Sequence, residues 1–139
     1  MGITLSHEHV LMDLTCIFEE PEDEEKNRQA YEPISMGNSG YFRYHLVENR
    51  DNLLLLNEEL VIKELLMFKE RGGRTVIDVT PCSDIGRNPL GIKRISENTG
   101  LNIIKGTGYY VEKSQRAEIM NKRSAEDIAE EFVNNIVQG

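Results

Sequence analysis

The sequence predicts an α/β fold in which parallel strands alternate with helices. Short β-branched or alternating apolar segments are typical of strands and occur three times: 2–9, 74–80 and 101–108. Amphipathic segments that begin with helix-capping residues follow each of these strands, with a long insert before the first helix. Repeated βα units of this kind build parallel sheets with helices outside. An open doubly wound sheet and a closed barrel begin with the same units, so this pattern leaves both architectures open.

The composition is that of a globular protein of one domain. The chain has 139 residues, of which 39% are hydrophobic and 29% are charged. A formal net charge of −8 argues against the basic face that nucleic acid or an anionic membrane would need, so we expect neither as a partner. No apolar run approaches the ~20 residues that span a bilayer, and the N-terminus lacks the pattern of a secretory signal.

The two cysteines, Cys16 and Cys82, are too few to indicate a disulfide framework. We expect both to be free thiols, which fits a reducing compartment. Together with the absence of a targeting or membrane-spanning pattern, this predicts a soluble cytoplasmic protein.

The first predicted strand, residues 2–9, carries two of the three histidines. Because side chains alternate between the two faces of a strand, we expect one face to carry the side chains of Ile3, Leu5, His7 and His9. Glu8 should point toward the helix layer, so we do not expect it to be a direct ligand. Two imidazoles aimed at the same space can bind one divalent ion such as zinc. The spacing also allows a second interpretation, in which hydrogen bonds at the strand end satisfy both rings.

A catalytic metal site takes at least three ligands from the protein in most cases. No later cluster of histidines, cysteines or carboxylates has the spacing of a ligand set. Any further ligands of such a site would therefore lie outside this sequence.

Residues 10–57 differ from the rest of the chain. They contain the acidic run FEEPEDEEKN and the aromatic- and glycine-containing segment YEPISMGNSGYFRY, and neither shows sustained periodicity. We interpret this stretch as a long loop or cap inserted after the first strand, a length that is unusual without a functional role. His45 is isolated within it, and a surface or packing role is expected.

Each predicted helix begins at a recognisable capping residue, and the first two end at glycine. The N-caps are Asn57, Asn88 (followed by Pro89) and Ser124, which opens the capping box SAED. The glycine stops are Gly72 or Gly73 for the first helix and Gly100 for the second. The apolar faces should consist of Val61, Leu65 and Phe68; Leu90, Ile92 and Ile95; and Ile128, Phe132 and Ile136.

Several motifs, taken in order, resemble the phosphotriesterase family of the amidohydrolase superfamily. They are GITLSHEH, GGRTVIDVT, DIGRNP, TGLNIIKGTGYY and the capping-box helix. The likeness is greatest to the phosphotriesterase-related and lactonase-like branches and covers residues 2–9 and about 50–139. Residues 10–49 fit the variable first loop of that family only loosely. The resemblance implies a (β/α)₈ TIM barrel, of which residues 1–139 form a single partial domain, the first three βα units with a long insert after strand 1. A complete barrel has about 250 residues.

The resemblance also implies a site with two divalent metal ions. Zinc is the expected metal, and manganese and cobalt are the alternatives. His7 and His9 match the first-strand His-x-His that binds the more buried ion in that family. The bridging lysine or glutamate and the other histidine and aspartate ligands come from later strands, beyond Gly139. The implied reaction is hydrolysis of a small-molecule phosphotriester, lactone or related ester by a hydroxide that bridges the ions. No catalytic residue other than the metal ligands is then expected in this chain.

The resemblance assigns roles to two loop residues as well. Tyr110 matches a tyrosine that lines the substrate pocket in lactonase-like relatives, although ordinary packing at the barrel rim would also explain it. Arg87 matches an arginine that fixes the loop after the second strand. Asn88 departs from the family, which often has aspartate there, and this departure leaves the metal ligands untouched.

The chain is therefore expected to be the N-terminal part of a metal-dependent hydrolase that is inactive alone. The first and third strands would then have open edges, which makes a homo-oligomer possible. The alternative is a non-catalytic binding or assembly module that retains the N-terminal part of the family. A third possibility is an open α/β binding domain that resembles a barrel only locally.

Overall fold

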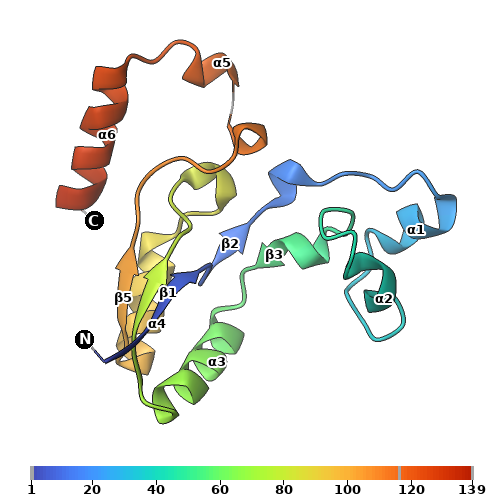
Figure 1. The fold of residues 1–139 in the computed structure, drawn as a ribbon, viewed down its shortest axis with the longest axis horizontal. Helices are drawn as coiled ribbons and strands as arrows, with labels where there is room; N and C mark the ends of the chain where they lie inside the picture. The colour runs from blue at the N-terminus through green and yellow to red at the C-terminus, as the bar shows by residue number, and fades with distance from the viewer. Residues whose placement is uncertain (1, 116, 139) are drawn as a thin grey trace.

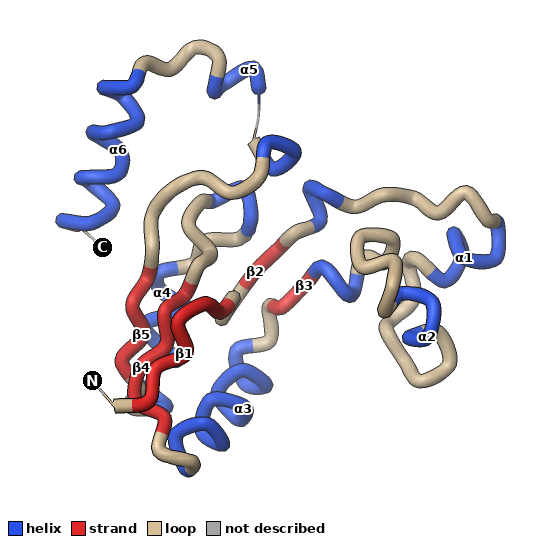
Figure 2. The backbone as a smooth tube through the Cα atoms, viewed as in Figure 1, coloured by secondary structure: helices blue, strands red, loops and turns tan. Residues whose placement is uncertain are grey.

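The computed structural model describes residues 2–115 and 117–138. Strands β1 (Ile3–Glu8), β4 (Gly73–Asp78) and β5 (Asn102–Lys105) form a parallel sheet in the order β1–β4–β5 (Figures 1 and 2). The long helices α3 (Glu58–Glu70) and α4 (Pro89–Thr99) connect these strands, and α6 (Ala125–Val137) follows β5. The predicted alternation of parallel strands and helices is confirmed.

Helices α3 and α4 pack against one face of the sheet and form its core. Seven buried residues make up this cluster: Val10, Leu11, Val61, Val76, Ile92, Ile95 and Leu101. Leu65 and Phe68 of α3 pack against it while partly buried, as their helical spacing predicts. Leu90 does not join the core, because its side chain at the first turn of α4 is 69% exposed.

The predicted helix caps are present. The side-chain oxygens of Asn57, Asn88 and Ser124 accept hydrogen bonds from backbone N–H groups three residues later, at 3.0, 2.9 and 3.1 Å. The reciprocal half of the capping box is also formed at α6. Gly72 (φ +92°) and Gly100 (φ +66°) adopt the left-handed conformation just after α3 and α4, which favours glycine at helix ends.

The first strand is less regular than its sequence predicts. Leu5 pairs with Val76 and Glu8 with Asp78, so β1 contributes one more residue than β4 between these pairs. This bulge interrupts the regular alternation of faces along β1. Leu5 packs against the core beside α3, and it also lines a cavity with Glu8 and His9. The third strand is also shorter than the predicted 101–108.

The segment 10–57 contains several short elements rather than a structureless loop. They are β2 (Met12–Asp13), η1 (Thr15–Ile17), α1 (Glu24–Gln29), α2 (Ser39–Phe42), η2 (Asp51–Leu53) and β3 (Leu54–Leu55). Antiparallel pairing of β2 with β3 closes the base of the segment. The part that contains α1 and α2 extends away from the sheet (Figure 1). We call residues 10–57 the insert below.

Short elements also follow the strands β4 and β5. They are η3 (Ser83–Ile85), η4 (Glu112–Ser114) and α5 (Ala117–Met120). Both cysteines are free, as predicted; Cys16 is exposed, and Cys82 is buried. None of the helices in the described residues has the length and apolar character needed to cross a membrane.

Candidate functional site

The two predicted metal ligands lie at the carboxyl edge of the parallel sheet. His7 belongs to the last part of β1, and His9 follows the strand directly. The residues after β4 and β5 reach the same edge, because parallel strands end on one side of a sheet. Active sites of barrel enzymes form at this edge.

The three predicted site residues have neighbouring rings. The ring centroids of His7 and His9 lie 6.2 Å apart, with the ring planes at 89°. The ring of Tyr110, from the loop after β5, lies edge-on to His9 with a centroid separation of 5.8 Å. Folding therefore brings Tyr110 to the histidine pair across about 100 residues of sequence. This contact does not distinguish a substrate-lining role from packing at the rim.

His9 is held by a hydrogen-bond network that sequence reasoning did not find. Its Nδ1 lies 3.0 Å from the Thr80 hydroxyl, and that hydroxyl donates a hydrogen bond of 3.0 Å to Asp78. Asp78 is fully buried at the end of β4 and forms an ion pair with Lys105 of β5. The network therefore connects the carboxyl ends of all three parallel strands.

Electrostatics favour a neutral His9. Burial lowers the pKa of His9 below its ordinary value, and the neighbouring His7 acts in the same direction. The nearby Asp78 carboxylate opposes this shift. Neutral imidazole is the form that binds metal ions, so the direction of this pKa shift suits a ligand.

The two histidines do not form a complete metal-binding set in the part of the chain that the structure describes. Within residues 2–115 and 117–138, no group of three or more histidines, cysteines or acidic residues is placed to hold a metal ion. Asp78 is engaged by Lys105, Thr80 and the backbone N–H of Val10. Glu8 lines a cavity beside α3 together with His9, Leu5 and Leu65. The chemistry of the two imidazoles fits a divalent ion that takes its other ligands elsewhere.

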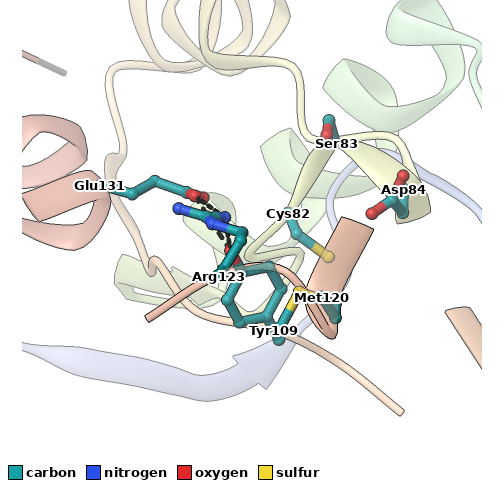
Figure 3. A pocket seen from close by; sticks show the side chains of 7 residues that line it. All are labelled: Cys82, Ser83, Asp84, Tyr109, Met120, Arg123 and Glu131. Atoms are coloured by element: carbon teal, nitrogen blue, oxygen red, sulfur yellow. Dashed lines mark hydrogen bonds and ion pairs between the residues drawn. The ribbon is translucent and has the colours of Figure 1, made fainter. Parts of the chain in front are cut away.

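A separate cavity of about 260 Å³ lies beside the loops that follow β4 and β5 (Figure 3). Tyr109 donates a hydrogen bond of 2.9 Å to Glu131 and accepts one from Arg123, which also forms an ion pair with Glu131. The pKa of Tyr109 is raised above its ordinary value, mainly by burial and also by the hydrogen bond to Glu131. Because these charges are paired with one another, the cluster fastens α6 to the loop after β5. Tyr109 therefore contacts α6, whereas the neighbouring Tyr110 contacts His9.

His45 lies in the insert, away from the other histidines in sequence and in contacts. Its ring stacks on Tyr41 with a centroid distance of 4.0 Å, and its Nδ1 lies 2.9 Å from Glu48. These contacts account for His45 by packing, in agreement with the prediction.

Sequence signals for the network around His9 exist but are weak. An aspartate inside the buried run of residues 74–80, with a threonine two positions later, indicates a polar group at a strand end. Lys105 is likewise a charged residue inside the predicted third strand, residues 101–108. Nothing in the sequence shows that these side chains meet His9, since that depends on the strand register.

The fold and the placement of the histidines define an α/β protein with a candidate metal centre at the carboxyl ends of its parallel strands. The family profile described as "Phosphotriesterase family" matches residues 1–139, and the chain belongs to that family.

Comparisons with individual proteins agree with this assignment. The chain is 34% identical over 149 residues to an N-acetyltaurine hydrolase of Dictyostelium discoideum, which covers 91% of this chain and 40% of the relative. It is 38% identical to a resiniferatoxin-binding protein of Rhodobacter sphaeroides, with a TM-score of 0.88 over 96% of this chain and 37% of that one. A phosphotriesterase homology protein of Escherichia coli, solved with phosphate in its active site, is 28% identical with a TM-score of 0.68, over 99% of this chain and 37% of that one.

These comparisons confirm the predicted fold class, the first three βα units of a (β/α)₈ barrel. The chain spans about 40% of the length of the curated relatives that it matches. Hydrolases are among these relatives, and the family is shared over the whole chain.

Proposed function

We propose that this chain supplies the N-terminal part of a metal-dependent hydrolase. In this proposal His7 and His9 bind one of two divalent ions, and Tyr110 lines the substrate pocket. Zinc is the proposed metal, with manganese or cobalt as alternatives. The remaining ligands come from later strands of the barrel. The insert forms a cap beside the site, and the protein works in the cytoplasm, where Cys16 and Cys82 stay reduced.

The observation that carries this proposal is the convergence of three rings at the carboxyl edge of the sheet. The ring centroids of His7 and His9 lie 6.2 Å apart, and those of His9 and Tyr110 lie 5.8 Å apart. This edge is where barrel enzymes build their active sites. The neutral form of His9, favoured by its burial, is the form that a metal ion requires.

The substrates that we propose are small molecules with a hydrolysable bond. Bound metal ions would supply Lewis acidity and an activated water near neutral pH. Phosphotriesters, lactones and related esters follow from the family, and the names of the relatives add the amide N-acetyltaurine. Within this chain, the histidines hold the ion, and the aromatic edge of Tyr110 limits the space beside it.

Metal binding can be tested on the 139-residue chain by zinc titration in a calorimeter. We expect zinc to bind the wild type weakly, since the chain offers two imidazole ligands, and binding to be lost in His7→Asn and His9→Asn. His45→Asn is the matched control, because it removes a histidine of the insert, and it should bind zinc as the wild type does. Equal binding by all four chains would contradict the assignment of His7 and His9.

We also predict that this chain by itself does not hydrolyse aryl phosphotriesters, lactones or N-acetyltaurine in the presence of zinc or manganese. Too few ligands are available to hold the ions in a catalytic geometry. Turnover that disappears with a chelator and in His7→Asn would show that this prediction is wrong.

A second candidate function is a binding module without catalysis. It is favoured by the similarity to a structure that is described as a resiniferatoxin-binding protein, with a TM-score of 0.88. Metal analysis separates the two candidates. A folded chain that binds a small apolar ligand but no metal would favour the binding module.

A further inference from the structure

We propose that Thr80 is a positioning residue that fixes the tautomer of His9. The Thr80 hydroxyl, which donates its own proton to Asp78, keeps the proton of neutral His9 on Nδ1 and leaves the lone pair of Nε2 free. The assignment of the proton stands on the hydrogen bonds alone. Its consequence, that Nε2 is the atom that binds the ion, rests on the proposed function.

The direction of each hydrogen bond in the network follows from the number of protons available. Asp78 is paired with the Lys105 ammonium group, so its carboxylate oxygens only accept hydrogen bonds. The Thr80 hydroxyl has one proton and donates it to Oδ1 of Asp78 at 3.0 Å. Thr80 can then only accept from the His9 Nδ1 at 3.0 Å, which places the proton on that nitrogen.

The opposite arrangement would be electrostatically unfavourable. If Thr80 donated to His9 Nδ1, the lone pairs of its oxygen would face the Asp78 carboxylate at 3.0 Å without a proton between them. Such a contact places two acceptors together in a buried site, where an unmade hydrogen bond costs most.

The surroundings keep the Thr80 hydroxyl in this role. Asp78 and Thr80 are both fully buried. Oδ1 of Asp78 also accepts from the backbone N–H of Val10 at 3.1 Å, immediately after His9 in the chain. Lys105 donates to the backbone oxygen of Thr80 at 3.1 Å, and its side chain is only 11% exposed. These bonds hold the Asp78 carboxylate and the backbone of Thr80 in place, which keeps the Thr80 hydroxyl beside Asp78.

Metal-binding histidines are commonly oriented by a hydrogen bond from their second nitrogen, which sets both the tautomer and the ring plane. Thr80 would supply this bond to His9, with Asp78 behind it. Loss of such a partner typically lowers metal affinity about 10-fold to 100-fold.

The test is to read the protonation of the histidine nitrogens by ¹⁵N NMR in the 139-residue chain at neutral pH without metal. We expect His9 to carry its proton on Nδ1 in the wild type and in Thr80→Ser, which keeps the hydroxyl. In Thr80→Val, which removes the hydroxyl at nearly constant volume, the two tautomers of His9 should mix. His45 provides an internal control and should not change in either variant.

Zinc titration of the same chains adds a second readout. We expect Thr80→Val to bind zinc about 10-fold to 100-fold more weakly than the wild type, and Thr80→Ser to bind it with nearly unchanged affinity. A merely structural role for Thr80 would leave the tautomer of His9 unaltered in a folded Thr80→Val chain.

These experiments test the role of Thr80 independently of metal binding by the proposed hydrolase. A wild-type His9 with its proton on Nε2 would overturn the proposal, whether or not Thr80→Val folds. An unchanged tautomer in folded Thr80→Val would also overturn it. A proton on Nδ1 that depends on Thr80, in chains that bind no zinc, would support the role of Thr80 and contradict metal binding.

Discussion

Asp78 satisfies three donors from three parts of the chain while it exposes none of its surface. Lys105 forms an ion pair with one carboxylate oxygen, and the Thr80 hydroxyl and the Val10 N–H donate to the other. Because both carboxylate oxygens have donors and one of them is paired with a charged group, the negative charge of Asp78 can be buried. A buried charge must be both paired and hydrogen-bonded. Asp78 thereby joins the strand ends on which His9 depends.

We predict that Asp78→Ala lowers the free energy of unfolding by about 3–5 kcal/mol, because removing one partner of a buried pair leaves the other charge uncompensated. Urea denaturation of the 139-residue chain measures this loss. The control is Glu97→Ala, which removes an exposed partner of Lys93 at 4.0 Å and should change the stability by no more than about 0.5 kcal/mol. A loss for Asp78→Ala no larger than that of the control would contradict the prediction.

Residues whose roles depend on near neighbours in the sequence could be predicted, and those that depend on register could not. The caps Asn57 and Asn88 contact N–H groups three residues away, so the sequence alone locates them. The spacing of His7 and His9 likewise predicts that they lie close together, and their rings are neighbours. Thr80 lies 71 residues from His9, and only the pairing of β1 with β4 brings them together.

At the scale of elements, the insert shows why periodicity is an incomplete guide. Its helices are short, and hydrogen bonds from side chains to the backbone organise the connections between them. The side chain of the fully buried Asn49 donates to the backbone oxygens of Gln29 and Glu32, both at 3.0 Å, and accepts from Asn52 at 2.9 Å. Such contacts leave no repeating apolar pattern, so the sequence predicted a loop where short elements exist.

The bulge in β1 is another feature that pattern cannot show. Strict alternation would place Leu5 and Glu8 on opposite faces, whereas with the extra residue between them both line the cavity beside α3, together with His9. The side that each residue of this strand faces therefore depends on its register with β4, which the sequence does not show.

The insert also contains a contact that responds to acid. The Tyr41 hydroxyl donates a hydrogen bond of 2.6 Å to Glu48. This bond is the main cause that holds the pKa of Glu48 below its ordinary value of 4.5, and the hydrogen bond with His45 acts in the same direction. The bond between Tyr41 and Glu48 also raises the pKa of Tyr41 to about 12. Because the pKa of Glu48 is lowered in the folded state, its stabilising contribution is complete above 4.5 and is lost as the pH falls through the folded-state pKa.

We therefore predict that Tyr41→Phe raises the pKa of Glu48 toward the ordinary value and makes the stability of the chain less sensitive to acid below pH 4.5. NMR titration of the Glu48 carboxyl carbon measures the first effect, and urea denaturation at several pH values measures the second. Tyr31→Phe is the matched control, since Tyr31 bonds to Glu20 instead. A Glu48 that titrates alike in all three chains would disprove the role of Tyr41.

At the scale of the whole molecule, the order of the βα units could be predicted, and the choice of a barrel required the family resemblance. In the described part of the chain, the sheet has three strands, and β1 and β5 each pair with β4 alone. The apolar side chains at their outer sides are accessible, with Ile3 56% and Ile104 50% exposed. On α6, Ile136 is 73% exposed, so the third predicted apolar face is only partly used. Apolar faces of this kind are covered in a complete barrel by its remaining units.

The open edges lead to a prediction for the 139-residue chain in solution. Unpaired strand edges with exposed apolar residues tend to pair with another chain, so we expect concentration-dependent self-association in analytical ultracentrifugation. Ile104→Lys should shift the chain toward the monomer, because a charged residue on an edge strand opposes pairing. Met36→Lys is the matched control: Met36 is 96% exposed but belongs to the insert, so it should leave the association unchanged. A monomer at every concentration, or an equal effect of both substitutions, would show that the edges of the sheet do not drive association.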